Sequence, residues 1–208
     1  LQPYFEHDME KLLTIEEKKN YIKQTVELIG CLFFRLSSHQ IVSPDIGNWQ
    51  NSGSPPNTVI CVGGIDKNGN DAVNDMTYII LKVIELLRIN DPNTHARYKS
   101  GKNSRAYLER VSDVNFITGA TPAIHGDDAM IKALLAHDGW KIEDIREWTP
   151  TGCVEPSIPG KHASATSSLE VNLVAPLEMA LNDGRHPLMR WQLGPHTGKI
   201  EKNVLINF

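Results

Sequence analysis

Helical spacing of apolar side chains dominates the N-terminal part of the sequence. Thr14 and Glu17 match a capping box, in which two side chains satisfy backbone N–H groups at the start of a helix. We expect a long helix after Thr14, with Cys31 inside it as a small core residue. The apolar stripe of this helix consists of Ile22, Val26, Ile29 and Phe33.

Short β-rich runs alternate with helical patterns in the middle of the chain. The run TVICVGG (58–64) ends in two glycines and predicts a buried strand, and NTHARYK (93–99) alternates in the manner of a second one. Between them, the wide apolar stripe of residues 72–89 predicts a core-facing helix. A capped helix follows in NSRAYLERV (103–111).

Helical patterns also fill most of the C-terminal half. GDDAMIKALLAHDG (126–139) has acidic residues in its first turn, and KIEDIREW (141–148) adds one or two further turns. A last helix is expected in residues 167–184, with Gly184 at its C-terminal end. Pro176 would kink this helix unless the helix begins there, since proline is tolerated in a first turn. Strands that alternate with helices predict an α/β layered or barrel architecture.

Composition narrows the class of protein. The 208 residues carry a net charge of -4 with acids and bases interspersed, which excludes a basic nucleic-acid surface. No apolar run is long enough to span a membrane and no signal-peptide core is found, so we predict a cytoplasmic protein. Cys31, Cys61 and Cys153 are odd in number and far apart, which argues against disulfides and a structural metal site. Leu1 and the apolar end NVLINF suggest an interior piece of a longer protein.

One broken stretch, TPTGCVEPSIPGKH (149–162), concentrates reactive side chains. In extended backbone Cys153 and Glu155 point to the same side, so that a thiol and a carboxylate share one cavity. Gly152 permits a tight turn and Pro156 ends strand pairing, which favours a rigid loop tip. The alternative is a buried small cysteine beside a solvated loop acid.

A thiolate nucleophile at Cys153 would need a histidine partner. The candidates are His125, His137, His162 and His186, and spacing does not choose among them. A neighbouring carboxylate raises a thiol pKa by like-charge repulsion. Glu155 therefore argues for a neutral thiol or a sulfur radical.

The segments around this stretch resemble the glycyl radical enzymes related to pyruvate formate-lyase. GCVEP resembles the cysteine loop of that family, and DPNTHARYKSG its Pro-Asn-x-x-x-Arg-Tyr strand. VGGIDKNGNDAVNDMTYIILKVI is similar to its strand, turn and helix, AIHGDD to its "NDE"-like helix start, and NLVAPLEMALNDG to the helix behind the loop. The similarity covers nearly the whole chain in order, so residues 1–208 are identified as a central fragment of a pyruvate formate-lyase-like (PFL) domain.

The resemblance implies a fold, a mechanism and partners. The fold would be part of a ten-stranded α/β barrel with long helices outside. Cys153 would become a thiyl radical, fed by a backbone glycyl radical, and abstract a hydrogen atom from a small substrate, while Glu155 moves a proton as general base and acid. A radical S-adenosylmethionine activase would install the glycyl radical. The resemblance also implies a homodimer without a bound metal or cofactor.

Departures from the family pattern narrow the subgroup. Pyruvate formate-lyase has two cysteines where this chain has Gly152 and Cys153, and the glycerol and choline branch has a His-Asp pair where Thr166 and Ser167 stand. These departures argue against a plain diol dehydratase. Ser167 is a candidate substrate-binding residue. His186 is similar in position to a substrate-contacting histidine of hydroxyphenylacetate decarboxylases, and its alternative role is a surface histidine behind a helix.

The glycyl radical motif, of the type Arg-Val-(Ser/Ala)-Gly-Tyr, does not occur in these 208 residues. We therefore expect this stretch alone to be inactive and the intact parent to be the enzyme. The leading hypothesis is a dehydratase, a decarboxylase or a C–N or C–S lyase. The alternatives are a radical-dead relative that serves as a binding or scaffold protein, a formate acetyltransferase-like acyltransferase, and a thiolate hydrolase or transferase.

Overall fold

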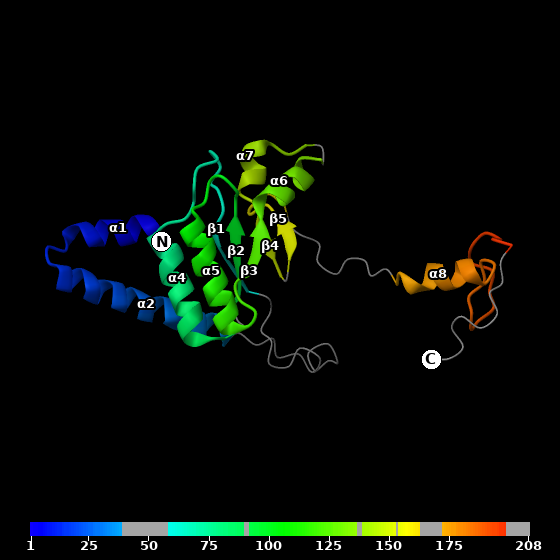
Figure 1. Cartoon of the computed structure of the whole chain (residues 1–208), viewed down its shortest axis with the longest axis horizontal. Coiled ribbons are helices and arrows are strands. Elements are labelled where there is room, and N and C mark those ends of the chain that lie inside the picture. Colours follow the sequence, from blue (N-terminus) through cyan, green and yellow to red (C-terminus); the bar gives the residue numbers. More distant parts are fainter. Residues whose placement is uncertain (39–57, 90–91, 137–138, 153, 163–171, 199–208) are drawn as a thin grey trace. The chain divides into compact units, whose positions relative to one another are not determined.

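The computed structural model describes residues 1–38, 58–89, 92–136, 139–152, 154–162 and 172–198 (Figure 1). The chain forms two units, residues 1–164 and 165–208. The first unit holds the sheets and six of the helices that are described, and the second holds a single described helix.

A three-stranded parallel sheet forms the centre of the first unit. Its strands lie in the order β1 (Val59–Gly63), β2 (Asn93–Tyr98) and β3 (Ala123–Gly126). The first two confirm the predicted strands. The third was not predicted, because Ala123–Gly126 has only four residues and just one β-branched side chain. Each strand is joined to the next by a helix, as parallel pairing requires.

Helices cover one face of this sheet. Figure 1 shows α4 (Asp75–Leu87) and α5 (Arg105–Thr118) beside the strands, with α1 (Gln2–Lys11) and α2 (Ile15–Ser37) beyond α4. The stripe predicted for residues 72–89 is buried against the sheet, which confirms that helix. The core between these layers contains Phe5, Ile29, Phe33, Val62, Met76, Ile79, Leu81, Val83, Ile84, Ala96, Tyr107, Val111 and Val114.

Helix α2 begins as the sequence predicts. The hydroxyl of Thr14 accepts a hydrogen bond from the Glu17 amide, and the Glu17 carboxylate accepts one from the Thr14 amide, which completes the capping box. The expectation for Cys31 was wrong, because this side chain is exposed. Cys31 lies two residues from both Ile29 and Phe33, about 200° around the helix, so it points away from their buried stripe.

A second, smaller core lies at one end of the sheet. Helices α6 (Asp127–Leu135) and α7 (Ile142–Arg146) pack together there and confirm the two predicted helical runs. Behind them the antiparallel strands β4 (Thr149–Thr151) and β5 (Glu155–Ser157) form a hairpin. The buried members of this core are Ile65, Ile131, Ile145, Trp148 and Ile158.

The described part of the second unit, residues 172–198, consists of α8 (Val174–Leu181) and a tight turn region. Pro176 stands in the first turn of α8, as predicted, where its missing N–H has no intrahelical acceptor to lose. The helix ends at Asn182 rather than at Gly184. Gly184 has φ +76° and donates its amide to the Met179 carbonyl at 2.7 Å, so it closes the helix end from two residues beyond the cap.

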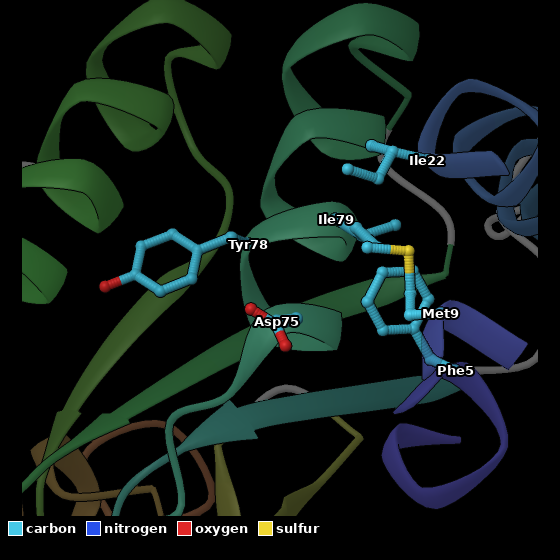
Figure 2. Close-up of a pocket in the computed structure, with 6 residues that line it drawn as sticks. All are labelled: Phe5, Met9, Ile22, Asp75, Tyr78 and Ile79. Carbon is cyan, nitrogen blue, oxygen red and sulfur yellow. The ribbon is translucent and has the colours of Figure 1, made fainter. Parts of the chain in front are cut away.

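A pocket of about 320 Å³ lies between α1, α2 and α4. Figure 2 shows Phe5, Met9 and Ile79 turned toward one another, with the ring of Tyr78 turned away from them. Its acidic member, Asp75, accepts a hydrogen bond from the Gln2 amide at 3.0 Å. This apolar pocket therefore offers no paired nucleophile and base, and it is not the candidate active site. Among the described residues, no helix combines the length and apolarity that a membrane span needs.

Candidate active site

The β4–β5 hairpin carries the predicted cysteine loop at its tip. Cys153 itself lies outside the described residues, but both neighbours are described. Gly152 has φ +58°, a left-handed conformation that favours glycine, and it connects the end of β4 to the loop. Gly152 therefore lies in a turn, as expected for a loop tip. The expectation that Pro156 ends strand pairing was wrong, because Pro156 pairs with Pro150 within the antiparallel β4–β5 ladder. This pair needs no N–H donor, since opposite residues in such a ladder alternate between hydrogen-bonded and non-hydrogen-bonded pairs.

The carboxylate of Glu155 folds back over this turn. A Cβ placed on Gly152 would lie 2.8 Å from Glu155 Oε2, so a larger residue here would displace this carboxylate, and the φ angle itself favours glycine. The Val154 amide donates a hydrogen bond to the same oxygen at 3.2 Å. The loop backbone thus holds the carboxylate beside the residue that precedes Cys153, where it could accept a proton from a substrate bound at the loop.

The parallel sheet anchors the hairpin from below. The side-chain amide of Asn93, at the start of β2, donates a hydrogen bond to the Gly152 carbonyl at 2.8 Å. Pro150 of β4 is buried, as is Gly152. The turn before Cys153 is therefore tied to a central strand by a contact between residues far apart in sequence.

A polar sheet face lies beneath this anchor. Parallel register places Cys61 of β1 beside His95 of β2, and Arg97 of β2 beside His125 of β3. Side chains of one strand alternate between faces, so these four share the face opposite to Val62, which packs in the helical core. His95 was missed as a candidate. The alternation in NTHARYK could have found it, because that alternation places His95 with Asn93 and Arg97.

His95 and His125 are hydrogen-bonded to each other. Nδ1 of His95 lies 2.9 Å from Nε2 of His125. Burial lowers the pKa of His95, and the neighbouring His125 lowers it further, whereas the Gly152 backbone and the Glu155 charge act in the opposite direction. Burial also lowers the pKa of His125. Both imidazoles are therefore biased toward the neutral form.

A buried ion pair supports the same face. Asp127 is fully buried and accepts two hydrogen bonds from the guanidinium of Arg97, at 2.8 and 2.9 Å, and one from the indole of Trp148 at 2.9 Å. Arg97 also donates to the Arg146 carbonyl at 2.8 Å. Every polar contact in this group is internal, so we read Arg97 and Asp127 as structural supports. The thiol of Cys61 lies nearby, and burial raises its pKa.

The remaining predicted site residues lie outside the described residues or in the second unit, which is described by itself. Ser167, Thr166 and His137 lie outside the described residues. His186 belongs to the second unit, where its Nδ1 accepts hydrogen bonds from the amides of Leu188 and Met189 at 3.3 and 3.2 Å. A neutral His186 would therefore carry its proton on Nε2.

The other histidines named as thiolate partners have neighbours of their own. His162 stacks edge-on against Trp140 with ring centroids 5.6 Å apart, and His125 is bonded to His95. Among the residues that the structure describes, no three His, Cys, Asp or Glu side chains come together as metal ligands would.

Comparison with known proteins gives a consistent family match. The sequence model of the family described as "Pyruvate formate lyase-like" matches residues 1–206. Trans-4-hydroxy-L-proline dehydratase of Clostridioides difficile is 29% identical over 200 residues, which cover 95% of this chain and 24% of that enzyme. Isethionate sulfite-lyase of Bilophila wadsworthia is 27% identical over 205 residues, which cover 96% of this chain and 23% of the relative.

A solved structure shares the fold as well. The crystal structure of the hydroxyproline dehydratase of Clostridioides difficile superposes with a TM-score of 0.75 and 28% identity, over 94% of this chain and 24% of that chain. The chain thus spans about a quarter of the length of the relatives it matches. Its α/β fold is that of glycyl radical enzymes over this stretch.

Proposed function

Because the chain belongs to the pyruvate formate lyase-like family, we propose that residues 1–208 carry the cysteine loop of a glycyl radical lyase. The observation that carries this proposal is the hairpin tip, where Gly152 at φ +58° and the folded-back Glu155 carboxylate flank Cys153. Dehydratase and C–S lyase relatives support the reaction class. The sheet and its helices would form part of the family's ten-stranded barrel, as a single PFL-type domain.

We propose a division of labour between two side chains. A glycyl radical elsewhere in the intact protein would take the hydrogen atom of the Cys153 thiol, which breaks the S–H bond, forms the glycine C–H bond and leaves a thiyl radical on Cys153. Cys153, as a thiyl radical, takes one hydrogen atom from a substrate carbon and later returns it to the product. Glu155 accepts a proton from the substrate radical and can return it to the leaving group. Hydrogen bonding from Val154 orients the carboxylate for this task.

Substrate contacts and partners follow as further proposals. Ser167 and the Nε2 of His186 are offered as polar contacts for a small substrate, such as a hydroxylated or sulfonated compound of the kind that the relatives' names state. A radical S-adenosylmethionine activase would install the glycyl radical. We further propose a homodimer in the reducing cytoplasm, without a bound metal or nucleic acid.

Electron paramagnetic resonance of the full-length protein, activated anaerobically by such an activase, tests this function. We expect a glycyl doublet, and turnover when trans-4-hydroxy-L-proline, isethionate and 4-hydroxyphenylacetate are offered in turn. Cys153→Ala and Glu155→Gln should keep the doublet and lose turnover. Cys31→Ala is the matched control, because Cys31 is exposed on α2, and it should keep both.

The outcomes separate the alternatives. Absence of the doublet in correctly folded protein would favour the radical-dead binding relative. Formation of acetyl groups from pyruvate would favour the acyltransferase. Full activity in Cys153→Ala would refute both hypotheses that place a radical on Cys153, the glycyl radical lyase and the acyltransferase.

A further inference from the structure

The proposed mechanism gives no role to the His95–His125 pair. Asn93, on the same strand as His95, is nevertheless hydrogen-bonded to Gly152 of the cysteine loop. His95 is fully buried, and its Nδ1 is engaged with His125 at 2.9 Å. Its other nitrogen, Nε2, is buried and makes no hydrogen bond of standard geometry. A buried polar atom left in this way costs about 1–3 kcal/mol, which is why such atoms call for a functional or structural reason.

The surroundings of His95 point toward the loop. Burial has the largest effect and lowers the pKa of His95, whereas the Gly152 backbone and the Glu155 charge both act to raise it. Asn93, two residues earlier on the same face of β2, already donates to the Gly152 carbonyl at 2.8 Å. A carbonyl oxygen has two lone pairs, so it can accept a second hydrogen bond.

The contact between the two rings decides what Nε2 of His95 can do. If Nε2 of His125 carries a hydrogen and donates it to Nδ1 of His95, then neutral His95 must carry its own hydrogen on Nε2 and can donate. In the opposite arrangement, Nε2 of His95 has only a lone pair and cannot bond a carbonyl. His125 therefore controls whether His95 can support Gly152.

We propose that His95 is a positioning residue that holds the backbone at Gly152, the residue before Cys153 in the sequence, by donating from Nε2 to the Gly152 carbonyl, and that His125 fixes the tautomer this requires. The inference rests on the proposed function of the cysteine loop and deepens it. His95 touches neither substrate nor radical, and it acts through Gly152. A shift of about 1 Å in the reacting sulfur could cost on the order of 100-fold in rate, which gives such a support its importance.

Exchange of the glycyl hydrogen in D2O tests this without knowledge of the substrate. In D2O the thiol of Cys153 becomes S–D and gives its deuterium to the glycyl radical. The resulting thiyl radical then abstracts the original hydrogen of the glycine Cα, so that the glycyl radical now carries deuterium. The glycyl doublet collapses as deuterium replaces the coupled hydrogen. The rate of this collapse in the activated full-length protein measures how well the loop presents its sulfur.

Two matched variants of His125 separate the tautomer from packing. His125→Phe keeps an aromatic ring near Trp148, whose centroid lies 5.9 Å from the imidazole, but has no N–H for His95. His125→Gln can still donate to Nδ1 of His95. We expect the collapse to slow about 10-fold or more in His125→Phe and to stay within about 3-fold of wild type in His125→Gln. His95→Phe should slow it further, to about 100-fold.

The results distinguish a failure of the positioning role of His95 from a failure of the proposed function of the cysteine loop. Equal rates in wild type and His125→Phe, or equal slowing in both His125 variants, overturn the positioning role. The doublet intensity serves as the folding control, and if His95→Phe shows none, the His125 comparison alone decides. A wild-type protein that forms no doublet, or whose doublet never collapses in D2O, fails the proposed function itself rather than this inference.

Discussion

Removal of the Asp127 carboxylate should be among the most destabilising single changes in the first unit. Its side chain has 0% exposure and that of Arg97 has 7%, so both charges lie out of water. Asp127→Ala leaves the guanidinium buried without a counter-charge, and breaking such a pair costs about 3–5 kcal/mol. The indole of Trp148 also loses its acceptor, which adds about 1 kcal/mol.

Asp128 provides the control within the same helix turn. It also stands in the first turn of α6 and pairs with a cation, Lys99, but its side chain is 55% exposed. Both carboxylates share the favourable position at the helix N-terminus, so the comparison cancels the helix-dipole contribution. Asp128→Ala should therefore cost only about 0–1 kcal/mol.

Urea unfolding of the 208-residue chain, followed by tryptophan fluorescence and by circular dichroism, measures both effects. We expect a fall in the unfolding free energy of at least about 3 kcal/mol for Asp127→Ala. The double variant Asp127→Leu with Arg97→Met should recover part of this loss, because it removes both charges together. A loss below about 1 kcal/mol, or one equal to that of Asp128→Ala, would refute the reasoning.

Three further changes test separate parts of the structure. Gly152→Ala should cost about 1–2 kcal/mol for its left-handed backbone and should also displace the Glu155 carboxylate, which activity of the full-length protein would report as a lower kcat. Thr14→Ala should cost about 1 kcal/mol in thermal unfolding, whereas Thr14→Ser should cost little. Iodoacetamide should label the exposed Cys31 before Cys61, and Cys61 only at higher pH, because burial raises the pKa of the Cys61 thiol. Mass spectrometry measures the order of labelling, and labelling of Cys61 before Cys31 would contradict this prediction.

Local signals were sufficient for most elements of the first unit. The capping box of Thr14, the stripe behind Asp75 and the β-rich runs at Val59 and Asn93 each depend on neighbours in sequence, and each element formed as predicted. Strand β3 depends on pairing with β2 rather than on its own composition, so nothing local marked it. Cys31 was misplaced because a helical pattern locates the buried stripe, while a small residue beside it gives no sign of its direction.

The candidate site was predictable in type but not in arrangement. Gly152 and Glu155 predicted a turn with a carboxylate. In the structure, Glu155 Oε2 lies 2.8 Å from the position that a Cβ on residue 152 would take. The anchor from Asn93 joins residues 59 positions apart, and the pairing of His95 with His125 joins residues 30 apart. Such contacts follow from strand order, which no local pattern specifies.

The two faces of the parallel sheet explain why these polar contacts gather where they do. Strands of such sheets are normally apolar on both faces, because helices cover both. Here the face that carries Val62 and Ala96 packs on helices, whereas the other face carries His95, Arg97 and His125. Imidazole and guanidinium groups are costly to bury unless they are paired. A polar sheet face of this kind is therefore typical of a functional site and not of an ordinary core. The β4–β5 hairpin is anchored to this face through Asn93, so the sheet takes a direct part in holding the turn at Gly152.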